Sequence, residues 1–364
     1  MKIGILTFHR AHNYGAVLQC YALQETLKSM GHDVNVINYI QKTIDETYHD
    51  HRSFSLRTFA KKLPIASWGY ALKSLYIDIN TVINGSQRKR VFEQFVHNRL
   101  NITPECSQNN IPQDFDVYIV GSDMVWDDVC TGGCFDDVFL GNFAHNTSAK
   151  LLGYAVSGTA RSFERLGKDF NYKHLTNFYN VSIRERSFAD IVKKFTGKDY
   201  PVCLDPTLLA NSKIWEPLLN SKWETRNYIV TYYIRVSGVD KAVINEKVRN
   251  YANEQGYEIV NLDATAEAIP VEEFLSIIRY SKYMVTDSFH GIIFSLLFHR
   301  SFNALIFHDS GDSRYVNLLT SIGLQKACVE KDFTPAIWAI NYSEIDEKLQ
   351  ILRKPSREYL YTNI

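Results

Sequence analysis

The feature that most constrains this fold is an alternation of short apolar runs with longer helical patterns, in two separate series along the chain. Short apolar runs are typical of strands buried on both faces of a parallel sheet, and the helical patterns between them supply the crossovers. Such an alternation predicts an α/β fold, with parallel sheets that carry helices on both faces. In the first series the runs are found at 3–8, 33–39, 117–121, 151–157 and 181–184.

The second series begins after a polar stretch at about 211–226, which we interpret as a linker. Its apolar runs are found at 228–234, 257–262, 283–286 and 302–307. Two such series in a chain of 364 residues predict two Rossmann-like domains that face a cleft. We assign residues 1–210 to the first domain and 211–341 to the second. The last segment, 342–364, is helical to about residue 353 and is expected to cross back to the first domain.

Residues 41–100 interrupt the rhythm of the first series. They are polar, basic in places and without a clear strand pattern, so we expect a helical insertion on the first domain. The helix that follows the first strand is expected from about Ala16 to Met30. Its apolar residues share one face, and Gly31 stands where a helix commonly ends.

Composition and charge exclude several classes of protein. The 40 Lys and Arg residues are balanced by 40 Asp and Glu residues, so no broad basic surface is available for nucleic acid. Only Cys130 and Cys134 are close among the cysteines, and no second Cys/His pair with zinc spacing follows, so we predict free thiols and no metal. The run at 3–8 is too short for a signal peptide, and no stretch approaches the roughly 18 apolar residues of a membrane helix. We expect a cytoplasmic protein, and peripheral association with the inner face of the membrane stays open.

The loop at 287–291 is the sharpest candidate for a functional site, because ligands of open parallel sheets bind beyond the carboxyl ends of the strands. Ser288, His290 and Gly291 lie here, between an apolar strand and an apolar helix. The imidazole of His290 can exchange a proton near neutral pH, and the free N–H groups of a helix start suit a phosphate or a carboxylate. Gly291 lets another group approach the backbone closely. A role for His290 in capping and packing alone is an equally weighted alternative.

Two arginines also follow strand ends. Arg184 comes directly after the run at 181–183, and Arg314 lies in the loop after the run at 302–307. A guanidinium at such a place can hold a phosphate or a carboxylate through two parallel hydrogen bonds. The alternative for Arg184 is an ordinary ion pair with Glu185, which is the commoner outcome for an arginine considered by itself.

Other polar residues at strand ends are weaker candidates. Asn13 and Gly15 stand at the start of the first helix, where N-cap is the commoner role for Asn13. Ser122 and Asp123 lie in a turn, and Asp205 lies at a further strand exit. The chain lacks the glycine-rich patterns of dinucleotide-binding and P-loop proteins and the GxSxG elbow of hydrolases.

Five segments, taken together and in order, resemble the polysaccharide pyruvyl transferase family. They are GILTF at 4–8 with NYGAVLQ at 13–19, the segment 116–126 with GSD at 121–123, VSIRE at 181–185, LDPTLL at 204–209 and TDSFHG at 286–291. The chain departs from the family pattern at three places. Met124 stands where a polar residue, commonly Gln, is expected, and Cys20 replaces a small residue. The turn VSGT at 156–159 replaces one of the Ala-Ser-Phe-Gly type.

The resemblance implies two Rossmann-like domains similar to the GT-B glycosyltransferases. It implies phosphoenolpyruvate as donor, no cofactor, and a cyclic pyruvyl ketal as product on a sugar of a bacterial surface polysaccharide or its lipid-linked precursor. Arg184 and His290 match the positions that the family uses for donor binding and catalysis. We assign substrate binding to the remaining candidates, which are Asn13, Gly15, Ser122, Asp123, Asp205, Ser288, Gly291 and Arg314. The alternatives are a GT-B glycosyltransferase that uses a sugar nucleotide and a non-catalytic sugar- or partner-binding protein.

Overall fold

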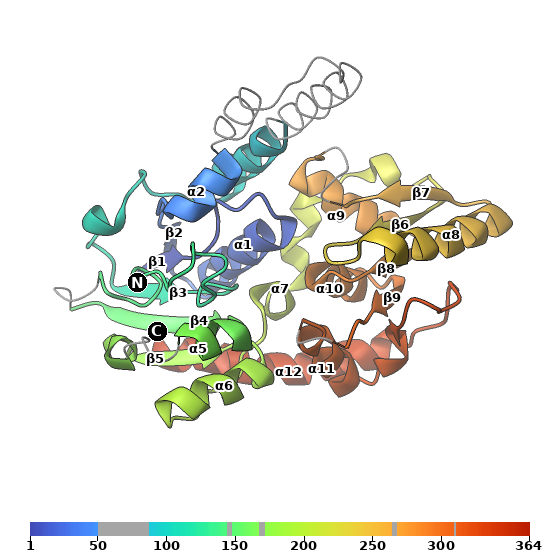
Figure 1. Cartoon of the computed structure of the whole chain (residues 1–364). Helices are drawn as coiled ribbons and strands as arrows, with labels where there is room; N and C mark the ends of the chain where they lie inside the picture. The colour runs from blue at the N-terminus through green and yellow to red at the C-terminus, as the bar shows by residue number, and fades with distance from the viewer. Residues whose placement is uncertain (50–86, 144–147, 167–171, 264–267, 309–310) are drawn as a thin grey trace, which may run out of the picture.

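The computed structural model of the chain describes residues 1–49, 87–143, 148–166, 172–263, 268–308 and 311–364. The first sheet contains β1 (Lys2–Leu6), β2 (Asp33–Val36), β3 (Val117–Val120), β4 (Lys150–Val156) and β5 (Asn180–Ile183). The second contains β6 (Tyr228–Tyr232), β7 (Glu258–Asn261), β8 (Tyr283–Thr286), β9 (Ser301–Leu305) and β10 (Cys328–Val329). The strand orders are β2-β1-β3-β4-β5 and β10-β9-β8-β6-β7, and the described strand pairs are parallel. The predicted fold of two Rossmann-like domains in a GT-B-like arrangement is confirmed (Figure 1).

Helices connect and cover the strands of both sheets (Figure 1). Before the linker they are α1 (Tyr14–Ser29), α2 (Lys42–His49), a helix at 87–99, α5 (Ala160–Leu166), α6 (Arg186–Thr196) and α7 (Pro206–Leu209). In the second half they are α8 (Gly238–Gln255), α9 (Val271–Tyr280), α10 (Phe289–Leu297), α11 (Ser313–Ser321) and α12 (Tyr342–Asn363). None of the described helices is long and apolar enough to cross a membrane.

Strand β3 illustrates why the apolar runs are continuous. All four of its residues are completely buried. Val117 and Ile119 belong to the apolar cluster that includes residues of α1, whereas Tyr118 and Val120 belong to the cluster that includes residues of α5 and α6. Because successive side chains of a strand point to opposite faces, a strand covered on both faces has an apolar residue at every position.

A single apolar cluster joins the two domains. It extends from Val17 of α1 through Leu208 of α7 and Trp215 of the linker to Phe294 of α10. Tyr14 at the start of α1 also stacks on Phe274 of α9, with ring centroids 4.1 Å apart and an angle of 5° between the planes. The relative position of the two domains therefore rests on close packing as well as on polar contacts, which matters for a site built from both domains.

Helix α12 continues ten residues beyond the predicted end at 353, through Pro355. Proline within a helix costs about 3 kcal/mol, which is why the sequence favours an earlier end. Contacts with the first domain accompany the extra turns. The amide N–H of Leu204 donates to Ser356 Oγ (2.8 Å), and the hydroxyl of Tyr359 donates to the carbonyl of Gly153 (2.9 Å). Tertiary packing thus outweighs the local preference.

Other parts of the chain differ from the predictions in detail. Of the expected insertion at 41–100, residues 50–86 lie outside the described residues, and the rest includes α2 and the helix at 87–99. Strand β10 was not predicted, because two residues are too few to produce a pattern. The linker consists largely of short 3₁₀ turns, found at Ser212–Ile214, Glu216–Leu218 and Ser221–Trp223. The proposed domain boundary at residue 210 falls between β5 and β6.

Candidate functional site

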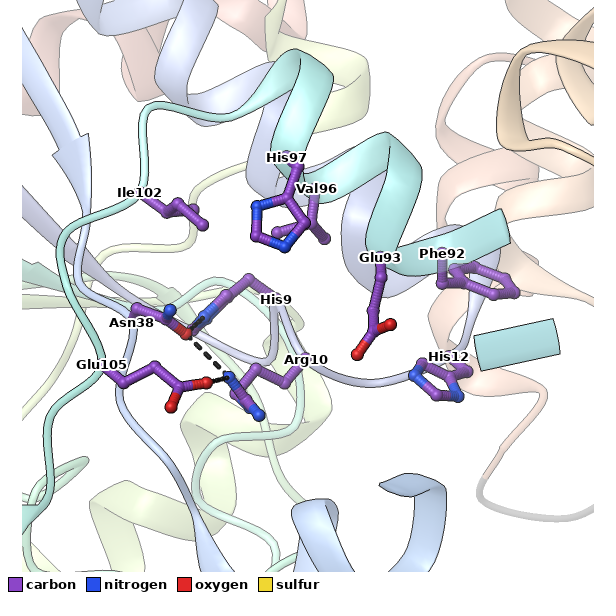
Figure 2. A pocket seen from close by; sticks show the side chains of 10 residues that line it. All are labelled: His9, Arg10, His12, Asn38, Phe92, Glu93, Val96, His97, Ile102 and Glu105. Carbon is purple, nitrogen blue, oxygen red and sulfur yellow. Dashed lines mark hydrogen bonds and ion pairs between the residues drawn. The ribbon is translucent and has the colours of Figure 1, made fainter. Parts of the chain in front are cut away.

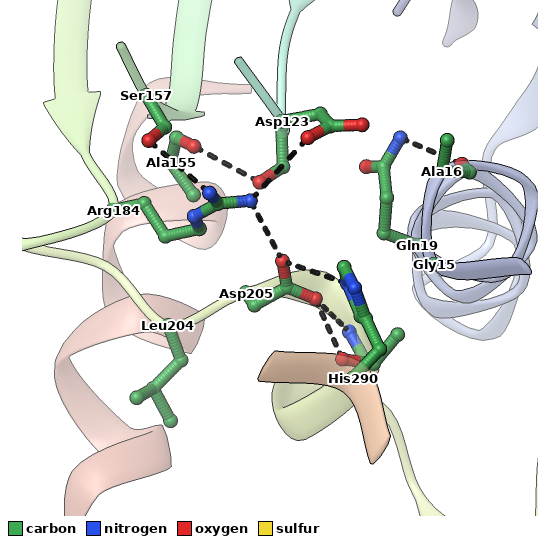
Figure 3. A network of polar contacts seen from close by, with 12 residues as sticks. Gly15, Ala16, Gln19, Asp123, Ala155, Ser157, Arg184, Leu204, Asp205 and His290 are labelled. Carbon is green, nitrogen blue, oxygen red and sulfur yellow. Dashed lines mark hydrogen bonds and ion pairs between the residues drawn. The ribbon is translucent and has the colours of Figure 1, made fainter. Parts of the chain in front are cut away.

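Arg184 follows β5 and is the centre of a buried polar network (Figure 3). Its Nε donates to Glu185 Oε1 at 2.7 Å, and its Nη2 donates to Ser157 Oγ at 3.1 Å. Its Nη1 donates to Asp205 Oδ2 at 3.3 Å and lies 3.8 Å from Asp123 Oδ1. One guanidinium is thus surrounded by three carboxylates. Burial alone would lower the pKa of Arg184, but the charges of these carboxylates raise it above its ordinary value.

Asp205 connects Arg184 to the second domain. One carboxylate oxygen, Oδ1, accepts hydrogen bonds from the backbone N–H (2.9 Å) and the hydroxyl (2.6 Å) of Thr207. The other oxygen, Oδ2, faces both Arg184 and His290 Nε2, which lies 3.7 Å away. Burial would raise the pKa of Asp205, but His290, Arg184 and the hydrogen bond from Thr207 hold it well below its ordinary value. Asp205 is therefore a carboxylate at neutral pH.

His290 lies in the first turn of α10 and reaches the network from the second domain (Figure 3). Its side chain is 13% exposed, and its Nε2 has no hydrogen-bond partner among the described residues. The 3.7 Å separation from Asp205 is too long for a hydrogen bond, so the contact is an ion pair when the imidazole is protonated. The structure thus places Arg184 and His290 on two sides of the same carboxylate, at the contact between the domains.

Gly15 of α1 packs directly against this imidazole. A Cβ atom at position 15 would overlap Nδ1, Cε1 and Cγ of His290. The absence of a side chain at Gly15 therefore allows α1 of the first domain and α10 of the second to approach each other here. The close approach of the two helix starts accounts for this glycine without a contact to substrate.

We expect Gly15→Ala to destabilise the protein by about 1–3 kcal/mol, because the added methyl group displaces the His290 ring. In a His290→Ala background the same change should be neutral or stabilising by up to about 1 kcal/mol, since alanine favours the helix more than glycine. Urea unfolding of the four proteins of this double-mutant cycle measures the coupling. Equal destabilisation in both backgrounds would show that the ring is not the obstacle.

Four of the predicted residues are engaged locally. Asn13 caps α1, because its Oδ1 accepts from the N–H groups of Gly15 (2.9 Å) and Ala16 (3.3 Å). Ser288 caps α10 by accepting from the N–H of Gly291 at 3.2 Å. Gly291 itself lies against β8, where a Cβ would come 2.7 Å from Thr286 Oγ1. The fourth residue is Ser122, whose hydroxyl is buried and donates to the carbonyl of Ala155 at 3.0 Å.

Arg314 lies at a cleft between the two domains, beside the polar network. The cleft is lined on one side by Met124, residues 158–160 and α6, and on the other by Gly311 and the first turn of α11, which carries Arg314. Burial and the nearby charge of Arg184 lower the pKa of Arg314 from its ordinary value. Arg314 forms no ion pair with another described residue, and its Nε donates only a long bond of 3.4 Å to the carbonyl of Gly311. Ser187 and Ser313 meet across the cleft, with their hydroxyls 3.3 Å apart.

A separate pocket lies in the first domain, at the ends of β1 and β2 and below the helix at 87–99 (Figure 2). His9, Arg10 and Asn38 form its floor. His9 Nε2 lies 3.1 Å from Asn38 Oδ1, and Arg10 pairs with Asp45 (2.8 Å) and Glu105 (3.1 Å). Because two carboxylates already match the charge of Arg10, this pocket is a poorer anion site than the cleft at Arg314.

The chain matches the sequence pattern of the polysaccharide pyruvyl transferases over residues 13–308. This match covers most of the chain. The chain belongs to the polysaccharide pyruvyl transferase family. Membership implies a transferase of polysaccharide biosynthesis with a polysaccharide as acceptor. No curated protein sequence matches the chain significantly.

Several solved structures are similar to this family member over most of its length, at low sequence identity. MnaA of S. aureus, solved with UDP, is 12% identical, with 98% of this chain and 89% of that chain covered and a TM-score of 0.47. The UDP-GlcNAc 2-epimerase of Methanocaldococcus jannaschii is 10% identical, with 97% and 93% covered and a TM-score of 0.48. UGT89C1 of Arabidopsis thaliana, solved with UDP-L-rhamnose, is 12% identical, with 98% and 94% covered and a TM-score of 0.41.

The sequence analysis of this family member missed three residues that lie at the polar network. Glu185 and Ser157 both contact Arg184, and Ser157 also donates to Glu185 at 2.8 Å. Gln19 of α1 is completely buried, and its Oε1 has no hydrogen-bond partner among the described residues (Figure 3). Glu185 and Gln19 stand in the segments that carry the family resemblance, and that was the available signal. In the part of the chain that is described, no group of His, Cys, Asp and Glu is arranged to hold a metal ion.

Proposed function

We propose that this protein transfers the pyruvyl group of phosphoenolpyruvate to two hydroxyls of one sugar, forming a ketal and releasing phosphate. The sugar belongs to a surface polysaccharide or to its lipid-linked precursor. The observation that carries the proposal is the meeting of Arg184, Asp205 and His290 beside the cleft at Arg314, within a chain of this family. The site combines a proton-exchanging group, a fixed carboxylate and a cation at a contact between two domains.

The charges around the site favour binding of the donor at Arg314. Arg184 is enclosed by Asp123, Glu185 and Asp205, so its charge is more than matched. Three of its five N–H donors are already used in hydrogen bonds. Arg314 has no ion pair among the described residues and faces the cleft. A phosphate or carboxylate of the donor would restore the charge balance of Arg314 through charge-assisted hydrogen bonds. In this proposal Arg184 holds the network in place beside the donor cleft.

The other walls of the cleft suit the rest of the donor. Ser187 brings a hydroxyl group, which can donate to a phosphate or carboxylate oxygen. Met124, Phe188 and Ile191 form an apolar side. The methylene of phosphoenolpyruvate, which becomes the methyl group of the ketal, is compatible with such a surface.

The reaction needs one proton at the methylene carbon and removes one proton from each sugar hydroxyl. Protonation of the methylene makes the adjacent carbon electrophilic, and the first hydroxyl attacks it to form a tetrahedral adduct. The carbon–oxygen bond to phosphate then breaks, phosphate leaves with a proton, and the second hydroxyl closes the ketal. We assign one of these transfers to His290, either as the acid at the methylene or as the base at the hydroxyl.

Asp205 acts on His290 as a positioning residue in this scheme. Its carboxylate is fixed by Arg184 and Thr207 and faces the imidazole Nε2. A fixed negative charge at this distance orients the ring. The imidazole could then take up and release a proton without leaving its place between the domains.

A thermal-shift comparison tests the proposed donor. Phosphoenolpyruvate at a hundred times its dissociation constant should stabilise the protein by about 2.7 kcal/mol, whereas UDP- and GDP-sugars should not. Arg314→Gln should lose most of this stabilisation, while Lys193→Gln, at an exposed ion pair, should keep it. Phosphate release in the presence of galactose-, glucose- and N-acetylmannosamine-type acceptors then identifies the acceptor. Stabilisation by a sugar nucleotide but not by phosphoenolpyruvate would instead indicate a glycosyltransferase.

A further inference from the structure

Two glutamines of α1 are completely buried, and they differ in what their amide groups contact. At Gln24 both ends are partnered, because Nε2 donates to the carbonyl of Arg99 (3.0 Å) and Oε1 accepts from the backbone N–H of Asn101 (2.7 Å). At Gln19 Nε2 is partnered, but Oε1 has no hydrogen-bond partner among the described residues. Buried polar atoms are nearly always hydrogen-bonded, so the amide oxygen of Gln19 calls for an explanation.

The orientation of the Gln19 amide is determined by its neighbours. Its Nε2 donates to the hydroxyl oxygen of Thr7 at 2.9 Å and to the carbonyl of Ala16 at 3.0 Å. The carbonyl can only accept, and the single hydroxyl proton of Thr7 is already donated to the carbonyl of Ser122 at 2.9 Å. An amide turned over would therefore place its oxygen against two acceptors. The amide oxygen is thus held on the other side, where it is available as an acceptor.

This oxygen faces the polar network that contains His290. Gln19 lies one helical turn after Gly15, so the two positions are neighbours on one face of α1, and Gly15 packs against the imidazole. Figure 3 shows the amide oxygen of Gln19 directed from α1 towards the network. His290 Nε2 is also buried and without a hydrogen-bond partner among the described residues, and it lies 3.7 Å from Asp205 Oδ2. The two unmatched atoms therefore belong to one region of the contact between the domains.

We propose that Gln19 is a positioning residue for His290, which it holds through one buried water molecule. The 3.7 Å between His290 Nε2 and Asp205 Oδ2 is too long for a direct hydrogen bond and suits an oxygen atom placed between them. A water molecule has two protons to donate and can accept from an N–H group. It donates to the amide oxygen of Gln19 and to Asp205 Oδ2, and it accepts from Nε2–H of His290, so all three groups are satisfied.

This arrangement assigns different tasks to the two nitrogens of the His290 ring. Nε2 carries a proton and is bound to the water, which fixes the tautomer and the orientation of the ring. Nε2 is buried, whereas the side chain as a whole is 13% exposed, so the exposed part of the ring lies elsewhere. Nδ1 is then the nitrogen that exchanges a proton with the substrate. The catalytic meaning of Gln19 rests on the proposed function, but the water and its three bonds do not depend on a substrate.

A high-resolution crystal structure of the full chain tests the water directly. It should show one ordered water within hydrogen-bond distance of Gln19 Oε1, His290 Nε2 and Asp205 Oδ2. A crystal structure of Gln19→Met, which keeps the length of the side chain and removes the acceptor, should lack this water. The proposal is overturned if the wild type has no water at this position, or if the water is retained in Gln19→Met.

NMR of isotope-labelled histidine side chains measures the effect on the ring in solution and needs no substrate. The Nε2–H signal of His290, assigned by its loss in His290→Gln, should be protected from exchange with solvent. In Gln19→Met the exchange should be about ten-fold faster or more, the usual effect of losing one hydrogen bond. Gln24→Met is the matched control, because it removes a buried amide from the same helix and should leave the signal unchanged. Equal exchange rates in the wild type and Gln19→Met would contradict the proposal.

Thr7→Val is a milder change, because it removes the oxygen that orients the Gln19 amide and leaves Gln19 in place. It should increase the exchange rate of the His290 signal in the same direction as Gln19→Met. If Gln19→Met does not fold, an unchanged exchange rate in Thr7→Val is the result that overturns the proposal.

Steady-state kinetics separates this inference from the proposed function. Gln19→Met should lower kcat about ten-fold and leave KM for phosphoenolpyruvate within about two-fold, since Gln19 is not among the described residues that line the donor cleft. A wild type without phosphoenolpyruvate-dependent turnover would overturn the proposed function and leave the bridging water to the crystal structure and NMR. An unchanged kcat in Gln19→Met would instead overturn the positioning role of Gln19.

Discussion

His290→Ala should lower the turnover of phosphoenolpyruvate-dependent phosphate release by about 10²–10⁴-fold, the usual contribution of a positioned acid or base. The imidazole faces a fixed carboxylate at Asp205, and its Nε2 has no hydrogen-bond partner among the described residues. Among the described residues, no other imidazole contacts the polar network around Arg184. Steady-state kinetics with saturating donor and acceptor measures the loss, and the melting temperature reports whether the fold is retained.

Two further substitutions separate a chemical role from a packing role. His290→Gln keeps a hydrogen-bonding side chain between α1 and α10 but cannot exchange a proton near neutral pH, so its turnover should fall as far as that of the alanine variant. His308→Ala removes an exposed histidine that pairs with Glu330 at 2.9 Å, and it should leave turnover unchanged. Near-normal turnover in His290→Gln would mean that the imidazole only fills the contact between the helices.

The location of the candidate site could be proposed from sequence because it follows from the topology of parallel sheets. Strand β5 ends at Ile183, directly before Arg184, and β8 is followed by the turn that leads to His290. Ligand sites lie beyond the carboxyl ends of such strands, so each residue could be assigned to an edge without coordinates. The segments of the family resemblance lie in these same loops. The family resemblance and the sheet topology therefore both indicate the carboxyl-terminal edges of the two sheets.

Whether each arginine forms an ion pair could not be predicted in the same way. From sequence, Arg184 had two outcomes, an anion clamp and an ion pair with Glu185. The structure contains the ion pair, together with contacts to Asp205 and Asp123 that come from distant parts of the chain. Arg314, which had the weaker sequence signal, has no ion pair with another described residue. Distances between loops of different strands decide such questions, and a local pattern does not contain them.

The departures from the family pattern have structural partners that the sequence did not indicate. Ser157, in the unusual turn at 156–159, donates to Glu185 at 2.8 Å and lies 3.6 Å from the sulfur of Met124, the other departure in this region. Thr159 of the same turn donates to Asp127 at 2.6 Å. The two departures are therefore neighbours that pack together at the wall of the cleft, beside Arg184. Met124 lines the wall of the cleft, and Ser157 belongs to the buried network around Arg184.

Arg184→Leu should destabilise the protein by about 3–5 kcal/mol at neutral pH, because it leaves the carboxylates of Asp205 and Glu185 buried without their cation. Lys193→Ala, which breaks the exposed pair with Asp199, should cost at most about 1 kcal/mol and serves as the control. The pKa of Asp205 in the folded protein lies below its ordinary value. Ionised Asp205 therefore stabilises the wild type at pH values above the ordinary pKa of an aspartate. That contribution is lost as the pH falls through the folded pKa.

Removal of Arg184 should raise the pKa of Asp205 in the folded variant, because one of the charges that lower it is gone. The buried carboxylates of the variant will then take up protons at a higher pH than those of the wild type, and protonation relieves the unpaired charge. The stability difference between the two proteins should therefore be largest near neutral pH and shrink towards about pH 4, near the ordinary pKa of Asp and Glu. Urea unfolding at both pH values measures it. A difference that stays constant, or grows in acid, would mean that Arg184 stabilises the fold by packing and not by its charge.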